Sequence, residues 1–493
     1  MKARIAIFVA IAVMAAIVFL GLGVRRTDYA PNWLAPPLSA PRVSGELVIL
    51  TLRGPTTTQL VARNKYDDRD PQTGFEHDLA TLFARELGVA VRFRIMPSYA
   101  AMIDQLNANR GHIAAAGISP TPELRAKFTF GPAYKTIQYQ LVYRSADKRP
   151  RNIADLGSRR LAVIAETPAH DIARDLTGAT PTLAIEVLPH DATPEVQLKA
   201  LEAKRADLAL IDTFAFAVAR RLHPDLSAAF NVGREAKVAW AFSNAADYDL
   251  QQSAVRFFEK IRANGTLNRL MDRYYGHVDR IQPVDSEALL GKSQSELPKL
   301  RAYFHEAQQL TGIDWRVLAA VGYQESHWDP LATSPTGVRG LMMLTEDTAD
   351  RMKVQNRLDA RQSILGGASY IALLRDTVPA RIPEPDRTWL ALAAYNQGYG
   401  HLEDARILTA RSGFNADSWL DVRKSYPKLR EPEVYETLKH GFCRGDEAVQ
   451  FVENIRNYAD ILTRLEKPYD AEMRGDSLLD AAAQAHERRR AKK

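Results

Sequence analysis

Glu325 lies in the stretch VGYQESHWDP, where a helix is expected to place apolar residues. Asp314 is a plausible N-cap of that helix, because its side-chain oxygen can accept from the free N–H groups of the first turn. Leu318 and Val321 recur at helical spacing and define a buried face, which Glu325 continues. Burial of a lone carboxyl group raises its pKa, and a general acid needs this near neutral pH. The alternative is an exposed Glu at a fraying helix end, or one paired with an arginine.

Three further stretches of the C-terminal part carry residues that suit a binding groove. In GVRGLMML, two glycines precede an apolar run and let a backbone or a ligand approach closely. AAYNQGYG ends a helical pattern with Tyr395 and Asn396 beside a glycine-rich turn, and NIRNYADIL places Tyr458 on a late amphipathic helix. Taken singly, Met342 is expected to fill the core, and each tyrosine to be a core residue with a satisfied hydroxyl.

Together and in this order, these motifs resemble those of the lytic transglycosylases of the soluble-lytic-transglycosylase type, which have a goose-lysozyme-like fold. The matching residues are Glu325-Ser326, Gly337-x-x-Gly340-Leu341-Met342, Ala394-Tyr395-Asn396 and Tyr458. The family pattern often has Gln after the Met, where this chain has Met343.

The resemblance implies roles for the matching residues. Glu325 is then the catalytic acid and base, and Tyr458 forms a hydrogen bond to it. Ser326 positions the sugar chain or the catalytic carboxylate, and Met342 lines the groove near the scissile bond. The side chains that would support the site are Tyr395 and Asn396.

No second carboxylate stands out beside Glu325, although hydrolytic glycosidases usually need two. Asp329 precedes Pro330 at a predicted helix end, so we expect it to be a cap or a turn residue. One carboxylate suffices if the C6 hydroxyl of N-acetylmuramic acid attacks its own C1. The resemblance therefore implies a lyase that cleaves the β-1,4 bond to N-acetylglucosamine in peptidoglycan glycan strands. It forms 1,6-anhydro ends with no metal or cofactor, and a muramidase that uses water is the alternative.

The composition fits a globular chain of several domains. The 493 residues are 46% hydrophobic and 25% charged, with a net charge of +6. No cluster interleaves Lys or Arg with aromatic residues, so nucleic acid is not an expected partner. Cys443 is the only cysteine, which excludes an internal disulfide and a Cys-rich metal site.

The N-terminus carries an export signal. Residues 5–24 form an unbroken apolar run of 20 residues with basic residues at both ends. The run is longer than most signal-peptide cores and just long enough for a membrane helix, so residues 1–26 are expected to be a signal sequence or an anchor. Residues 27–44 are rich in Pro, Ala and Ser and are expected to be an extended spacer.

Strand and helix patterns alternate over residues 45–277. GFEHDLATLFARELGV predicts an amphipathic helix, and the predicted strands are GELVILTL, VAVRFRIM, RRLAVIAE, LAIEVLP and ADLALID. The alternation predicts an α/β fold with a mainly parallel sheet. Ligands of such folds bind at the carboxyl ends of strands.

This region resembles the periplasmic solute-binding proteins of the polar amino acid type, which implies a type II periplasmic-binding-protein fold. In that family an Arg after TPE clamps the ligand carboxylate, but here Leu124 holds the place and Arg125 follows. Asp212 matches the amine-binding Asp, or it is simply the N-cap of the helix TFAFAVARR. Thr167 follows Glu166 where the family has a Gly-Thr turn. The implied ligand is an amino acid or a muropeptide, unless binding has been lost.

Residues 278–298 are polar and weakly patterned and are expected to be a linker. Residues 299–468 carry only helical periodicity and predict an all-α domain. Residues 469–493 form a basic tail that is expected to be disordered.

A solute-binding-like domain joined to a transglycosylase-like domain resembles the modular, membrane-bound members of this family. The resemblance implies that the first domain regulates the second. It also implies a place in the periplasm, on the inner face of the outer membrane. The alternative is an inner-membrane anchor through residues 5–24. A ligand sensor with an inert helical domain is a further alternative for the whole chain.

Overall fold

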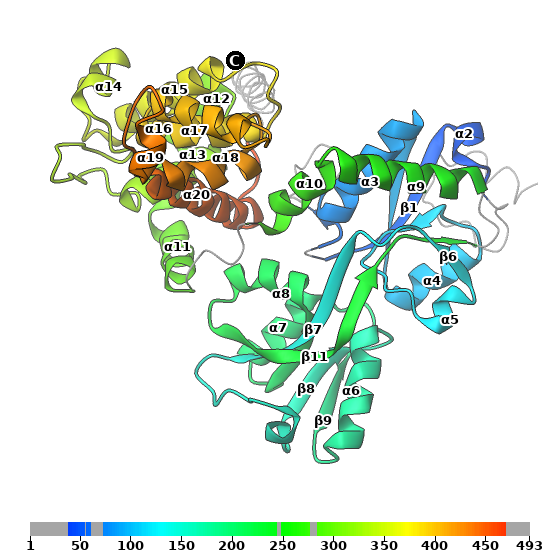
Figure 1. Ribbon diagram of the computed structural model, residues 1–493. Coiled ribbons are helices and arrows are strands. Elements are labelled where there is room, and N and C mark those ends of the chain that lie inside the picture. Colours follow the sequence, from blue (N-terminus) through cyan, green and yellow to red (C-terminus); the bar gives the residue numbers. More distant parts are fainter. Residues whose placement is uncertain (1–37, 55, 61–71, 244–247, 277–282, 470–493) are drawn as a thin grey trace, which may run out of the picture.

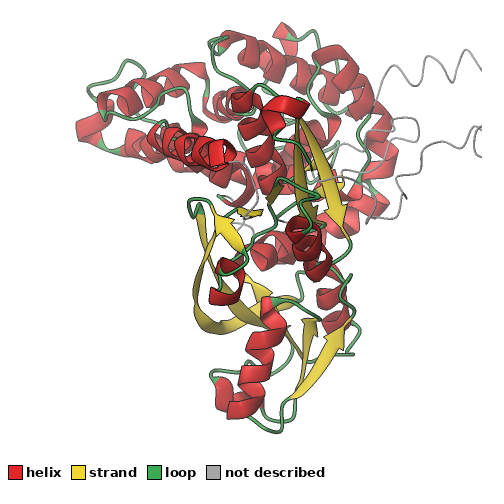
Figure 2. Cartoon of the chain, turned by 90° about the vertical axis from the view of Figure 1, so that its right-hand side faces the viewer, coloured by secondary structure: helices red, strands yellow, loops and turns green. Residues whose placement is uncertain are grey.

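The computed structural model describes residues 38–54, 56–60, 72–243, 248–276 and 283–469. The predicted leader, most of the predicted spacer and all of the predicted tail beyond Tyr469 lie outside these ranges. None of the helices within them has the length and apolarity needed to cross a membrane. All described strands lie in the N-terminal part and the C-terminal part is helical, as Figure 2 shows.

The N-terminal domain has two lobes, each built around a five-stranded sheet. The first sheet has the order β4-β1-β5-β12-β6, with β1, β4 and β5 parallel and β12 antiparallel to β5 and β6. Its strands are β1 (Glu46–Leu52), β4 (Ala90–Met96), β5 (Ile113–Ala114), β6 (Phe128–Phe130) and β12 (Ala241–Ser243). Its helices are α2 (Pro41–Ser44), α3 (Phe75–Leu87), α4 (Tyr99–Asn107), α5 (Pro122–Arg125), α9 (Tyr248–Ala263) and α10 (Thr266–Tyr275). A small ribbon pairs β2 (Gln59–Leu60) with β3 (Gln72–Thr73).

The second sheet has the order β11-β7-β10-β8-β9. Its strands are β7 (Lys135–Arg144), β8 (Arg160–Ile164), β9 (Ala184–Leu188), β10 (Leu208–Asp212) and β11 (Leu226–Val238). Its helices are α6 (Pro168–Ala179), α7 (Pro194–Glu202) and α8 (Thr213–Ala219), with 3-10 turns at Ile153–Leu156 and Arg220–Leu222.

The expectation of one mainly parallel sheet was wrong, because both sheets are mixed. The long strands β7 and β11 are antiparallel to each other, and β7 is also antiparallel to β10. The segments that connect the lobes run side by side, since Gly131 N donates to Trp240 O and Tyr134 N donates to Val238 O. In Figure 1, β7 and β11 lead from the second lobe toward the first. The type II two-lobe fold therefore accounts for the strand patterns.

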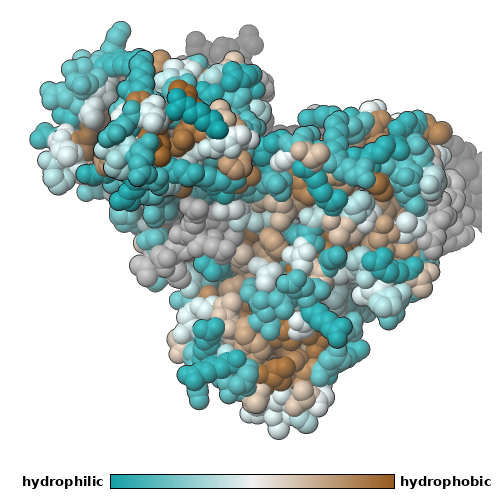
Figure 3. Space-filling view, in the orientation of Figure 1, coloured by the Kyte–Doolittle hydropathy of each residue, from teal (hydrophilic) through white to brown (hydrophobic). Residues whose placement is uncertain are grey.

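The C-terminal domain is all-α, as predicted. Its helices are α12 (Leu297–Thr311), α13 (Trp315–Ser326), α14 (Glu346–Arg351), α15 (Ala360–Thr377), α16 (Asp386–Gln397), α17 (Tyr399–Arg411), α18 (Trp419–Ser425), α19 (Pro432–Tyr435) and α20 (Gly445–Leu465), with a 3-10 turn at Tyr426–Arg430. Helix α13 is buried on almost every side, packed against α12, α15 and α20. Hydrophilic side chains cover most of the visible face of this domain, as Figure 3 shows.

Most of the expected linker is helical among the residues that the structure describes. Residues 283–295 form α11 (Pro283–Ser295), which packs against α12 and α20. Leu289 of this helix is fully buried in the core of the C-terminal domain. Residues 283–295 contain few apolar side chains, so their periodic pattern was too weak to predict the helix.

A buried ion cluster joins the two domains. Asp272 of α10 pairs with Arg456 of α20 at 2.9 Å and with Arg423 of α18 at 2.7 Å. Glu453, one turn before Arg456, pairs with both arginines at 3.0 Å. Asp272 belongs to one domain and both arginines to the other, so their pairing requires that the domains stay together. Because these charges are largely withdrawn from water, breaking the pairs is costly.

Candidate functional site

Glu325 lies in the last turn of α13. The helix starts as the sequence predicts, since Asp314 accepts from the backbone N–H of Arg316, and it ends at His327 in the left-handed conformation. The Glu325 side chain is half-buried. Burial raises the pKa of its carboxyl group to about 8. No described residue donates a hydrogen bond to this carboxyl group or forms an ion pair with it.

Ser326 ties the end of α13 to the following loop. Its hydroxyl donates to Leu341 O at 2.8 Å and to Gly322 O at 3.2 Å. The loop can come this close because Gly322 of α13 has no side chain, and a Cβ there would lie 2.7 Å from Leu341 Cδ2. Ser326 therefore holds the helix turn that carries Glu325.

Tyr395 lies close enough to Glu325 for the two groups to interact electrostatically. Burial and the Glu325 carboxylate raise the pKa of Tyr395 well above its usual value. Its hydroxyl donates to Met342 O at 2.7 Å, and its ring stacks on Phe451 of α20. Tyr395 thus links α16 to the loop that Ser326 also holds.

The expectation that the Met342 side chain lines the groove was wrong. This side chain is fully buried in the domain core, and the backbone N–H of Met342 donates to the Ser363 hydroxyl at 3.1 Å. Met342 presents its backbone carbonyl, and not its thioether, to the site. The apolar run around it packs inward, which was the alternative expectation of a core filler.

Asn396 is exposed and faces a groove. Its side-chain oxygen accepts from the Gln397 amide at 2.9 Å. The groove has a volume of about 320 Å³ and is lined by Gln324, Asn396, Asp446, Glu447, Gln450 and Phe451. Gln324, the residue before Glu325 on α13, lines this groove, whereas Glu325 itself is not among the lining residues.

The expected hydrogen bond from Tyr458 to Glu325 is not formed between these two described residues. Tyr458 is buried on α20, and its ring packs edge-on against Tyr323 of α13, with ring centroids 4.9 Å apart. Burial raises the pKa of the Tyr458 hydroxyl. Tyr458 therefore supports the helix that carries Glu325 through ring packing.

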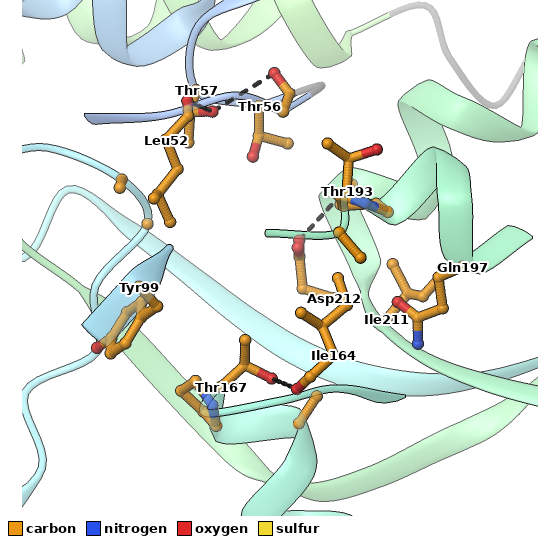
Figure 4. A pocket seen from close by; sticks show the side chains of 18 of the residues that line it. Leu52, Thr56, Thr57, Tyr99, Ile164, Thr167, Thr193, Gln197, Ile211 and Asp212 are labelled. Carbon is orange, nitrogen blue, oxygen red and sulfur yellow. Dashed lines mark hydrogen bonds between the residues drawn. The ribbon is translucent and has the colours of Figure 1, made fainter. Parts of the chain in front are cut away.

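The N-terminal domain holds a second candidate site, a pocket between the two lobes. Figure 4 shows Thr56, Thr57 and Tyr99 of the first lobe across the pocket from Thr167 and Asp212 of the second. The Thr167 hydroxyl donates to Ile164 O at 2.8 Å. Asp212 is the N-cap of α8, as one interpretation expected, and it also lines the pocket, where its role in binding an amine stays a prediction.

Arg125 does not reach this pocket, so its assignment as a ligand residue was wrong. It is exposed on α5, with its guanidinium over the Phe130 ring. Sequence reasoning missed Lys135, which lines the pocket from the start of β7. A charged residue that opens an apolar strand was the signal that could have identified it.

No cluster of three or more His, Cys, Asp or Glu side chains suited to a metal occurs within the part of the chain that the structure describes. Asp329 accepts from Leu331 N at 2.9 Å and is a turn residue, as expected.

Comparison with protein families assigns both halves of the chain. Residues 59–277 match the family described as "Bacterial extracellular solute-binding proteins, family 3". Residues 302–417 match the family described as "Transglycosylase SLT domain". Among solved structures, a mutant of the arginine-binding protein of T. maritima is 21% identical. It covers 48% of this chain and 97% of its own, with a TM-score of 0.42.

Curated relatives cover most of the chain. The membrane-bound lytic murein transglycosylase F of Nitrosospira multiformis is 45% identical over 424 residues, which are 86% of this chain and 87% of the relative. The protein of the same name from Methylobacillus flagellatus is 43% identical over 433 residues, 87% of this chain and 90% of the relative. The protein of the same name from Thiobacillus denitrificans is 44% identical over 437 residues, which are 88% of this chain and 91% of the relative.

Proposed function

The chain belongs to the family of membrane-bound lytic murein transglycosylases F, and from this premise we propose that Glu325 is the acid and base with which it cleaves murein. The protein is a lytic transglycosylase, a lyase that degrades murein, with a solute-binding domain ahead of the catalytic one. The observation that carries the role of Glu325 is its half-buried carboxyl group, whose pKa burial raises to about 8. The group is protonated at neutral pH, as a general acid must be.

The reaction requires two proton transfers through the same carboxyl group. Glu325 first donates its proton to the glycosidic oxygen between N-acetylmuramic acid and N-acetylglucosamine, and the C1–O bond breaks. The resulting carboxylate then takes the proton of the C6 hydroxyl as that oxygen bonds to C1. The products are a 1,6-anhydromuramic acid end and a free N-acetylglucosamine end, and Glu325 is protonated again.

Other described residues hold this geometry. Ser326 fixes the last turn of α13 to Leu341 O, and Tyr395 fixes α16 to Met342 O. Asn396 offers its amide to the sugar chain in the groove. Tyr458 packs behind the helix through Tyr323.

The alternative of hydrolysis needs a second carboxylate to activate water. The groove has two candidates, but Asp446 pairs with Arg430 at 2.7 Å and Glu447 pairs with Arg444 at 3.4 Å. Neither contributes to the pKa shift of Glu325, which is due to burial. This favours the intramolecular attack by the C6 hydroxyl.

Digestion of purified murein followed by mass spectrometry tests the proposal. The wild-type protein is expected to release anhydro ends, and Glu325→Gln is expected to release none. Glu287→Gln changes an exposed Glu on α11 and serves as the matched control. Reducing ends from the wild type would support the muramidase. Unchanged turnover by Glu325→Gln would support a ligand sensor whose helical domain is inert.

The solute-binding domain supplies regulation in this proposal. A small ligand, an amino acid or a muropeptide, binds between the lobes and favours one arrangement of the two domains. The ion cluster around Asp272 transmits the change to α20, which packs against α13. A ligand that changes the rate of murein cleavage by the full-length protein, with no effect on Glu325→Gln, is the expected result.

The partners are the glycan strands of peptidoglycan and a membrane. The protein acts in the periplasm on the inner face of the outer membrane, and the alternative is anchoring in the inner membrane through residues 5–24. Separation of the two membranes by density, with detection of the tagged full-length protein, distinguishes these locations.

A further inference from the structure

A further pocket lies between the first lobe and the catalytic domain, and we call it the interdomain pocket. Its volume is about 550 Å³, within the range of about 300–1,000 Å³ for small-molecule sites. It shares no lining residue with the pocket between the two lobes. Its walls come from α3 and α10 of the first lobe and from residues 383–385, α16, α18 and α20 of the catalytic domain. In Figure 1, α10 lies between α3 and the catalytic domain.

The charges that line the interdomain pocket balance, because arginine and carboxylate side chains are present in equal number. Arg273 pairs with Asp78 at 3.1 Å, and Arg456 pairs with Asp272 at 2.9 Å. A pocket without net charge does not favour an ion. An uncharged ligand with many hydrogen-bonding groups can instead use both the donors and the acceptors of such a lining.

Three polar groups of this lining have no partner among the residues that the structure describes. The guanidinium group of Arg85, exposed on α3, forms neither a hydrogen bond nor an ion pair with them. The indole N–H of Trp389, half-buried on α16, has no acceptor there. Oδ1 of Asp386 accepts from Trp419 N at 2.8 Å, but no described residue donates to its Oδ2. Two kinds of donor and one acceptor, from two domains, are therefore available to a ligand.

Trp389 supplies a fixed aromatic surface. The guanidinium carbon of Arg456 lies 5.8 Å from the centroid of the indole ring, and Arg456 is itself buried and paired with Asp272. Trp389 also packs against the core of the catalytic domain. Pro383 and Pro385, which have rigid rings, line the same pocket. A sugar ring has an apolar C–H face and a rim of hydroxyl groups, so an indole beside free donors and acceptors suits it.

We infer that the interdomain pocket binds a segment of an uncharged sugar chain. One sugar ring packs against Trp389, Arg85 donates to a hydroxyl or acetamide oxygen, and Asp386 Oδ2 accepts from a hydroxyl or amide group. The inference deepens the proposed function and rests on it, because the glycan strand of murein is the sugar chain that the enzyme cleaves. Since Arg85 and Asp386 belong to different domains, the bound chain joins the two domains at a place outside the catalytic groove.

Calorimetric titration of full-length Glu325→Gln tests the inference, in a detergent without a sugar headgroup that could compete. The probe is N-acetylchitotetraose, an uncharged chain of N-acetylglucosamine units, and the substitution prevents cleavage during the titration. We expect one binding event in the catalytic groove and another in the interdomain pocket. Asn396→Ala, added to the same protein, is expected to weaken the event in the groove and to leave the other unchanged.

Further variants assign the other event to the interdomain pocket. Arg85→Gln is expected to weaken it about 10- to 100-fold, the range for a hydrogen bond from a charged group, and Asp386→Asn and Trp389→Leu are also expected to weaken it. Arg125→Gln is the matched control, because it makes the same change at an exposed arginine of the first lobe that does not line the pocket. Since Arg85 is exposed, Arg85→Gln is expected to fold, and it decides the question even if Trp389→Leu does not.

Tetraose binding that Arg85→Gln leaves unchanged would overturn the inference, whether one event or two are observed. Binding of tripolyphosphate that depends on Arg85, with no tetraose event that does, would also overturn it and would show an anion site instead. A single tetraose event that Arg85→Gln weakens and Asn396→Ala does not would support the inference. The release of anhydro ends by the wild type tests the proposed function separately, because it does not depend on the number of tetraose events.

Discussion

Arg456 of the catalytic domain donates from its guanidinium to the carboxylate of Asp272 in the solute-binding domain, at 2.9 Å. The same helix, α20, also reaches the second lobe, since Arg221 donates to Asp460 at 2.7 Å. Both lobes are thus bonded to the helix that carries Tyr458, which packs against α13. We expect a change in the angle between the lobes to act on α20, because its two contacts lie on different lobes.

Asp272→Asn is expected to destabilise the contact between the domains. The substitution preserves shape but leaves Arg456 and Arg423 to share Glu453, which is fully buried. Breaking a buried pair typically costs about 3–5 kcal/mol. Calorimetric unfolding of the full-length protein measures the loss. Asp446→Asn is the control, since its pair with Arg430 is exposed and is expected to contribute about 0–1 kcal/mol. Equal effects of the two variants would contradict the role of the cluster.

Murein cleavage is expected to decline at alkaline pH with a single titration. Burial raises the pKa of Glu325 to about 8, and in the proposed mechanism the protonated form donates to the glycosidic oxygen. Above this value kcat/KM should fall about tenfold per pH unit, because the free enzyme loses its acid. The rate of anhydro-product release from soluble glycan fragments measures the profile. A rate that is flat through pH 9 would show that Glu325 is not the proton donor.

The same carboxyl group makes stability depend on pH. Its folded pKa of about 8 lies above the value of 4.5 for an unperturbed Glu, so between these values only the folded state holds the proton. Stability therefore falls as pH rises from about 4.5 to 8. Glu325→Gln does not titrate. The free energy of unfolding of the variant minus that of the wild type should therefore be about 3–5 kcal/mol larger above pH 8 than at about pH 4. Parallel stability curves in denaturant would contradict the raised pKa.

Local signals in the sequence predicted the helix that carries the candidate catalytic residue. The cap at Asp314 and the apolar spacing up to Glu325 involve neighbours along one helix, and the structure keeps both. The surroundings of Lys135 in the pocket between the lobes include Phe75, Phe214 and Tyr275, which lie far away along the chain and meet only after folding. The position of Met342 likewise depends on packing within the domain core, which a motif does not encode.

Ser326→Ala is expected to lower kcat with little change in the fold. The hydroxyl bonds to Leu341 O and Gly322 O, and its loss should cost about 1 kcal/mol of stability. Because the Glu325 turn then becomes less constrained, we expect kcat to fall about tenfold, as for a small misplacement of a catalytic group. Ser412→Ala is the matched control, since this exposed serine at the C-cap of α17 donates its hydroxyl hydrogen bond to Leu408 O of that helix. Identical activity of the two variants would argue against positioning by Ser326.

Gly340→Ala and Gly337→Ala separate close packing from backbone strain in the loop after α13. Both glycines have positive φ, +83° and +82°, so each substitution introduces about 1–2 kcal/mol of strain. At Gly337 nothing lies within 4 Å of the added Cβ, whereas at Gly340 the Cβ would lie 1.8 Å from Arg357 O. The backbone must move there, and with it the carbonyl of Leu341 that holds Ser326. We therefore expect Gly340→Ala to lose murein cleavage as well as stability, and Gly337→Ala to lose only the smaller amount of stability. Thermal unfolding and the cleavage rate measure both effects, and equal losses in the two variants would show that strain alone governs the loop.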